Sequence, residues 1–294
     1  MKDRILMQIA NSLSANVQKV KKSGLLEGKM GVAVFLYHYA RYSGRTSYHD
    51  LVDHLISEII SNISKRQISL PAGIGGVCWG FKHLIREQFI KRDDEILKDM
   101  DGSIVSCIKT NTDKEMLNGV LYLACCHPEL LDDMLIPILT SQISNYLQSD
   151  NHSPEVLNKI LAISLRLPHQ QIYPWCELLP DVAIRAIDAG LYCNSDLMIC
   201  KDLICAFNGN KDNRSWSLLQ DRCISMLTGK ELLTDHIETV WQYMIFLDGK
   251  RKTVCDLEQL SSMVNDMLKD LKESDMYLYS GLPAMGMYVL FIEK

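Results

Sequence analysis

The sequence predicts an all-α fold: an (α/α) toroid or barrel of seven helical-hairpin repeats, with an inner and an outer layer of helices. Three observations carry this prediction. Apolar residues recur at helical spacing along nearly the whole chain, Pro and Gly gather between those runs, and one short pattern returns at intervals of roughly 40 to 48 residues. No Ser-, Gly- or Pro-rich linker divides the chain, so we expect a single domain over residues 1–294.

The first helix of a repeat is predicted from amphipathic runs. Clear examples lie at 4–20, 51–63, 95–108 and 257–271. Each combines apolar residues at helical spacing with polar and charged residues between them, which is the pattern of a helix with one buried face. We therefore expect these helices to form the outer layer.

The second helix of each repeat is recognised by an anchor position near its start. The pattern is plainest around Gly31 in "SGLLEGKMGVAVFLYHYA" and Gly76 in "SLPAGIGGVCWGFKHLI", and it weakens along the chain. The seven anchors are Gly31, Gly76, Gly119, Lys159, Met198, Val240 and Tyr288. The helices at these anchors are short and rich in small and apolar residues, which favours the inner layer. A two-helix unit cannot bury its own apolar face, so neighbouring repeats must stack to form a core.

Composition excludes several classes of partner. The chain has 294 residues, 47% of them hydrophobic and 23% charged, and its formal net charge is -5. This balance is that of an ordinary globular protein, and it argues against nucleic acid or an anionic membrane, both of which need a basic surface. Ten cysteines are scattered without a C-x-x-C pair, and no signal peptide or membrane-spanning run is found. We expect a cytoplasmic protein with free thiols.

The glycine pattern resembles that of a known family. The G-L-x-x-G-x-x-G motif before an apolar helix, in seven degenerate copies, is similar to that of the lanthionine synthetase C-like (LanC-like) cyclases. The strongest stretches are "GLLEGKMGVAVFLYHYARYSGRTSYHD" at 24–50 and "LPAGIGGVCWGFKHLI" at 70–85. The resemblance implies an α/α toroid. In active members it implies a central zinc ion, held by two cysteines and one histidine, and the addition of peptide cysteine thiols to dehydrated Ser or Thr.

The resemblance also implies a position for each zinc ligand. The family's first cysteine falls on Cys193, its second cysteine on Asp235, and its histidine on His236. Cysteine, aspartate and histidine are all competent zinc ligands, so this set could hold the ion. The alternative is that Cys193 is a buried thiol and that Asp235 and His236 are helix-start residues. We expect no cofactor, with zinc as the possible exception.

The positions for proton transfer are less well preserved. The family's histidine in the fourth repeat is replaced here by Glu155, and an acidic residue of the third repeat corresponds best to Asp113, one residue out of register. Either carboxyl group could return a proton to the product of thiol addition. The competing interpretation is that both are solvated surface carboxylates.

Two classes of function remain open from the sequence, and whether the protein is an enzyme is not decided. The first is a LanC-like pseudo-enzyme that binds a peptide or protein partner, such as a precursor peptide or its modifying enzyme. The second is a zinc-dependent cyclase with a Cys/Asp/His variant of the site. The degenerate later repeats favour the first class, and the metal content of the protein separates the two.

Overall fold

A computed structural model shows an all-helical chain and describes most of its residues. The described ranges are 1–63, 67–110, 115–131, 135–168, 174–207, 214–227, 232–247 and 256–291. These ranges contain fourteen α-helices and no β-strand. The all-α fold class predicted from the sequence is therefore confirmed.

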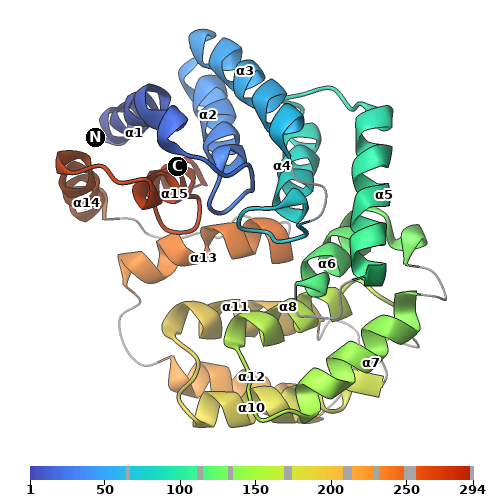
Figure 1. The fold of residues 1–294 in the computed structure, drawn as a ribbon. Coiled ribbons are helices and arrows are strands. Elements are labelled where there is room, and N and C mark those ends of the chain that lie inside the picture. The colour runs from blue at the N-terminus through green and yellow to red at the C-terminus, as the bar shows by residue number, and fades with distance from the viewer. Residues whose placement is uncertain are drawn as a thin grey trace. The chain divides into compact units, whose positions relative to one another are not determined.

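The helices follow one another as seven pairs (Figure 1). Their bounds are α1 Lys2–Asn16, α2 Lys29–Ser43, α3 Ser47–Asn62, α4 Ile74–Arg86, α5 Asp94–Thr110, α6 Met116–Cys126, α7 Leu135–Gln148, α8 Pro154–Ser164, α10 Leu179–Asp188, α11 Asn194–Phe207, α12 Arg214–Met226, α13 Leu233–Phe246, α14 Leu257–Lys269 and α15 Leu282–Phe291. All seven anchor residues lie in the second helix of a pair, from Gly31 in α2 to Tyr288 in α15.

Burial separates the two members of a pair, as the two-layer prediction requires. Residues 29–40 of α2, 116–124 of α6 and 282–289 of α15 are buried without exception. The first helices bury only a stripe: α7 buries Leu135, Leu139, Ile143 and Leu147, one residue in every four. The second helices thus form the apolar inner layer, and the first helices cover it with one face each.

The chain divides into two compact units. One comprises residues 1–104, 232–245 and 249–294, and the other comprises residues 105–231 and 246–248. In the first unit, α15 packs against α1 and α2, so the last inner helix lies beside the first pair (Figure 1). In the second unit, α8 packs against α6, α10 and α11, and α12 packs against α10 and α11.

Hydrogen bonds join the loops that lead into three inner helices of the first unit. The amides of Leu25 and Glu27, before α2, donate to the carbonyls of Leu70 and Pro71, before α4, at 3.3 and 2.9 Å. On the other side, the amide of Tyr279, before α15, donates to the carbonyl of Leu26 at 3.1 Å. The seventh, first and second repeats are therefore linked in that order at one end of their inner helices.

Gly31 and Gly76 are needed at this junction because the backbones approach so closely. A Cβ atom on Gly76 would lie 2.1 Å from the Leu70 carbonyl oxygen, and one on Gly31 would lie 2.3 Å from the Leu25 carbonyl oxygen. Real Cβ atoms do not come this near to backbone atoms. The glycines that carry the family resemblance therefore have a packing role in this structure.

The sequence also predicts free thiols and the absence of a membrane-spanning helix. The nine cysteines among them are all free thiols. Within the described ranges, no helix has both the length and the apolar character needed to cross a bilayer.

Candidate functional site

Cys193 lies at the start of α11, in a cluster of polar side chains within the second unit. Its Sγ atom donates to Oδ2 of Asp196 at 3.0 Å and lies 2.9 Å from Oγ of Ser195. The backbone amide of Cys193 also points to Oδ2 of Asp196, at 3.4 Å. Asp196 therefore caps the first turn of α11 and accepts the thiol proton of the residue before that helix.

Burial and the Asp196 carboxylate determine the protonation of this cluster. Cys193 is an exposed residue, so the interpretation of it as a buried thiol is wrong. Partial desolvation of its sulfur still raises its pKa, and the side-chain hydrogen bond and negative charge of Asp196 raise it further, while the bond to Ser195 and the backbone bond to Asp196 act in the opposite direction. Burial also raises the pKa of Asp196, and its bonds from Cys193 partly offset this. Since only the thiolate is a good nucleophile and metal ligand, Cys193 is held in its less reactive form.

The start of α8 lies beside this cluster. Nδ2 of Asn158 donates to the backbone carbonyl of Asp196 at 3.1 Å, which ties α8 to the first turn of α11. Glu155, in the first turn of α8, contributes a negative charge that raises the pKa of Asp196. The same carboxylate lies 3.4 Å from Nζ of the buried Lys159. The fourth- and fifth-repeat positions singled out in the sequence, Glu155 and Cys193, thus belong to neighbouring helix starts.

Asp235 and His236 belong to the other unit, at the start of α13. The Asp235 carboxylate accepts the backbone amide of Leu232 at 3.0 Å, so it caps α13 as Asp196 caps α11. The His236 ring stacks on Tyr288 of α15, with centroids 6.1 Å apart and planes at 15°. Over the described ranges, no group of three or more His, Cys, Asp or Glu side chains is placed to hold a metal ion. That Cys193, Asp235 and His236 converge stays a prediction.

His38 and His83 form a buried contact between α2 and α4. Their Nε2 atoms lie 2.7 Å apart, so one imidazole donates to the other. The Phe89 ring packs edge-on against His38 at 4.8 Å, and Nη2 of Arg86 lies 3.3 Å from Nδ1 of His83. These histidines, seven residues after Gly31 and Gly76, pack between inner helices.

A family model identifies the chain. The model for lanthionine synthetase C-like proteins matches residues 19–178, which is more than half of the sequence. The chain belongs to the lanthionine synthetase C-like family.

A solved structure agrees with this LanC-like assignment. Nisin cyclase is similar over 98% of this chain and 93% of its own, with a TM-score of 0.58 and 12% sequence identity. At this identity the likeness shows the fold alone, which is the α/α toroid predicted from the sequence. No curated protein matches the LanC-like chain by sequence.

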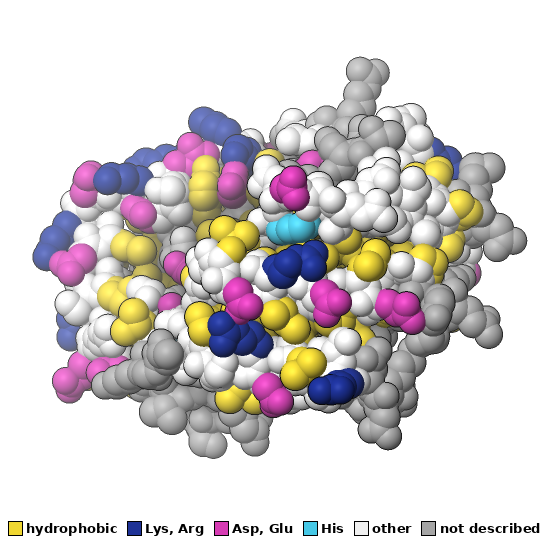
Figure 2. All heavy atoms as spheres, turned by 90° about the horizontal axis from the view of Figure 1, so that it is seen from below, with side chains coloured by type: hydrophobic (Ala, Val, Ile, Leu, Met, Phe, Trp, Pro, Cys, Tyr) yellow, Lys and Arg dark blue, Asp and Glu magenta, His cyan; other side chains and the backbone are white. Residues whose placement is uncertain are grey.

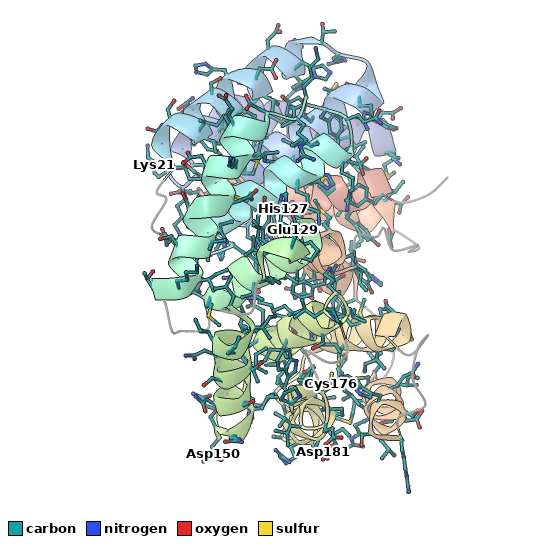
Figure 3. The ribbon with its side chains drawn as sticks, turned by 90° about the vertical axis from the view of Figure 1, so that its right-hand side faces the viewer. Lys21, His127, Glu129, Asp150, Cys176 and Asp181 are labelled. Atoms are coloured by element: carbon teal, nitrogen blue, oxygen red, sulfur yellow. The ribbon has the colours of Figure 1, made fainter. Side chains whose placement is uncertain are left out.

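The matched region covers only part of the candidate site. The LanC-like model ends at residue 178, so it includes Glu155 but stops before Cys193, Asp235 and His236. Asp113, the other candidate proton donor, lies outside the described residues. Cys176 is buried (Figure 3), and burial raises its pKa to about 12.

Sequence reasoning missed Asp196 and Asn158, although both lie in stretches that it considered. Asp196 comes three residues after Cys193, and Asp235 comes three residues after Leu232. An acidic residue at this spacing is the pattern of a side chain that caps a helix start. Applied to "LYCNSD", this rule predicts the contact between Asp196 and the Cys193 backbone, and it places a carboxylate beside the thiol.

Proposed function

We propose that this LanC-like protein binds a peptide or protein partner associated with peptide modification, and that it no longer catalyses cyclisation. The family assignment supports the peptide partner. The observation that supports the loss of catalysis is the exchange of the family's second ligand cysteine for Asp235, together with the Asp196 carboxylate beside Cys193, which disfavours the thiolate that a cyclase needs.

The contacts of the residues at the zinc-ligand positions disfavour binding of the ion. Cys193 donates its thiol proton to Asp196, and the Asp235 carboxylate is engaged with the start of α13. Exchanging a thiolate ligand for a carboxylate also replaces a soft donor by a hard one. Cys193 would have to lose its thiol proton before Cys193, Asp235 and His236 could share an ion, and a hard carboxylate would stand in place of a soft thiolate, which supports the pseudo-enzyme.

The alternative function is a zinc-dependent cyclase with a Cys193, Asp235 and His236 site. Cyclisation would form a bond between the peptide sulfur and the β-carbon of a dehydrated residue, and it would return a proton to the α-carbon. The place of Glu155 beside the Asp196 and Cys193 cluster favours this alternative, because a carboxyl group there could supply that proton.

Metal content separates the two proposals. Protein purified without chelator is expected to contain well below one zinc per chain, measured by inductively coupled plasma mass spectrometry. Cys193→Ala should not change that value, and Cys205→Ala, at an exposed cysteine further along α11, is the matched control. One zinc per chain that is lost in Cys193→Ala and kept in Cys205→Ala would contradict the pseudo-enzyme and support the cyclase.

A further inference from the structure

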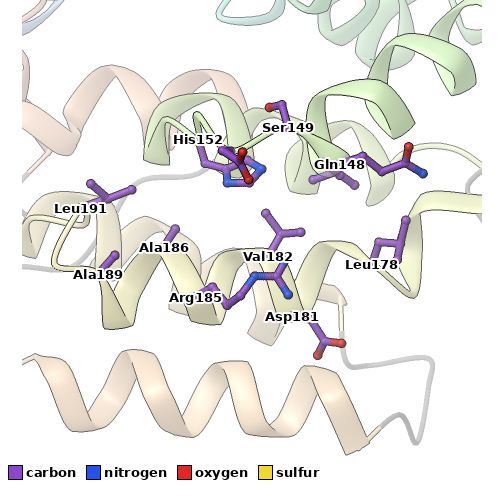
Figure 4. Close-up of a pocket in the computed structure, with 12 residues that line it drawn as sticks. Gln148, Ser149, His152, Leu178, Asp181, Val182, Arg185, Ala186, Ala189 and Leu191 are labelled. Carbon is purple, nitrogen blue, oxygen red and sulfur yellow. The ribbon is translucent and has the colours of Figure 1, made fainter.

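An open cleft lies on the outer layer of the second unit. It is formed by the end of α7, the loop that follows, and one face of α10, and its volume is about 440 Å³ (Figure 4). All of its lining residues fall between 147 and 191, within one unit. A volume of this size is enough for a small molecule or a few residues of peptide.

The cleft is a trough that runs along the whole of α10. Leu178, Val182, Arg185 and Ala189 line it at helical spacing, so they occupy one side of the helix. Eleven residue steps of 1.5 Å give a length of about 16 Å. That length matches about five residues of extended chain at roughly 3.3 Å each, which favours a peptide over a compact small molecule.

The two ends of the trough expose apolar side chains. Leu178 at one end is 40% exposed and Leu191 at the other is 49% exposed. Between them, the buried side chains of Val182 and Ala186 form the floor, with Leu147 of α7 opposite. Burial of such leucines by a partner is favourable, because it removes apolar surface from water.

Arg185 supplies a cation in the middle of the trough. Asp181 precedes it by four residues on α10, a spacing that often gives an ion pair. Figure 4 shows the two side chains pointing in different directions, and across the described part of the chain Arg185 has no ion pair. The guanidinium is therefore available to a carboxylate of a partner, with which it forms strong charge-assisted hydrogen bonds.

His152 lines the cleft opposite α10 and adds a second polar group. Its ring packs edge-on against Tyr146, with centroids 5.5 Å apart and planes at 85°. Its Nε2 atom is buried, and it has no hydrogen-bond partner among the residues that the structure describes. A buried nitrogen without a partner is costly. Because this atom is covered from solvent, His152 forms part of the wall opposite α10, and Arg185 is the group that meets the charge of a partner.

We propose that this trough binds an extended peptide segment of about five residues, with a carboxylate side chain at its centre and apolar residues at its two ends. The carboxylate would meet Arg185, and the apolar residues would meet Leu178 and Leu191. Asp150 and Asp181, at the lower edge in Figure 3, disfavour a polyanion such as nucleic acid. The face seen from below in Figure 2 likewise shows acidic and basic side chains interspersed with apolar ones.

The test uses the full chain and fluorescently labelled peptides with blocked ends. The probe is Leu-Ser-Glu-Ser-Leu, and its partner carries Gln in place of Glu; binding is followed by anisotropy. We expect the Glu peptide to bind about tenfold more tightly, because a hydrogen bond to a charged group is lost in the Gln peptide. Equal affinity for the two peptides, or no binding of either, would overturn the proposal.

Substitutions in and near the trough make the test specific. Arg185→Gln is expected to remove the preference for Glu, and Arg185→Glu to favour a Lys-centred peptide instead. Leu191→Ser, at an exposed position, should weaken the binding of both peptides equally. Arg214→Gln, at an exposed arginine of α12 that does not line the cleft, is the matched control and should leave the preference unchanged. A preference that survives Arg185→Gln would contradict the assignment.

Two other outcomes are informative. If the protein is a dimer in sedimentation and Leu191→Ser makes it a monomer, the trough is an interface between copies and the peptide proposal is wrong. The inference rests on the proposed function only in taking a peptide as the partner. Stoichiometric zinc would contradict the pseudo-enzyme, but the preference for the Glu peptide could still be measured. Failure of the proposed function can therefore be distinguished from failure of the peptide proposal.

Discussion

Replacing Gly76 by alanine is expected to lower the free energy of unfolding by about 3 kcal/mol. The new Cβ atom would lie 2.1 Å from the Leu70 carbonyl oxygen and 2.6 Å from the Leu25 amide nitrogen. These two atoms form the hydrogen bond that joins the loops before α2 and α4. The methyl group would therefore separate two backbone segments, which cannot move aside as a flexible side chain can.

The measurement is chemical denaturation followed by circular dichroism. Gly102→Ala is the matched control, because Gly102 lies within α5 and a Cβ atom there meets nothing within 4 Å. Alanine at that position should leave stability unchanged or raise it by up to about 1 kcal/mol, since alanine favours helix over glycine. Equal changes in the free energy of unfolding for the two substitutions would show that Gly76 has no role in joining the repeats.

Replacing Asp196 by asparagine is expected to lower the pKa of Cys193 and to speed alkylation of this thiol about tenfold at pH 8. The Asp196 carboxylate accepts the thiol proton and places a negative charge beside the sulfur, and both effects raise the pKa. Asparagine keeps an oxygen for the start of α11 but carries no charge, so the thiolate becomes easier to form. Iodoacetamide labelling, resolved by peptide mass spectrometry, measures the rate at Cys193.

The same digest supplies the controls for this prediction. Cys205 is also exposed and lies further along α11, so its labelling rate should not change. Asp202→Asn removes a carboxylate from the same helix and should leave Cys193 unaffected. A slower or unchanged rate at Cys193 in Asp196→Asn would mean that Asp196 does not hold the thiol in its protonated form.

The repeat architecture was predictable because the same pattern of apolar spacing and anchor position occurs in each of the seven repeats. Apolar spacing and the anchor positions predict seven pairs of helices, and even weak anchors such as Lys159 and Met198 lie in second helices. The sequence places Pro and Gly between the helical runs. It does not predict the hydrogen bonds between the loops before α2 and α4, because these depend on two loops 45 residues apart in sequence meeting in space.

The candidate site was predictable only in part. The sequence places Glu155 and Cys193 near the starts of the inner helices of the fourth and fifth repeats, and the structure joins these helices through Asn158 and Asp196. The approach of Cys193 to His236 stays a prediction. The contact of Cys193 with Asp196 depends on how the first turn of α11 directs a carboxylate back to the residue before the helix. No sequence motif predicts the outer trough, because its residues have the pattern of an ordinary amphipathic helix. The trough is recognised only from the structure, in which one face of α10 is uncovered.

We propose that this LanC-like protein binds a peptide partner but does not cyclise it. The most direct measurement incubates the purified protein, with added zinc, with a synthetic peptide that carries one dehydroalanine and one nearby cysteine. Cyclisation leaves the peptide mass unchanged, so the thiol that remains is counted by alkylation. We predict that the thiol disappears no faster than in buffer. Faster loss of the thiol that is abolished in Cys193→Ala would contradict the account and establish an active cyclase.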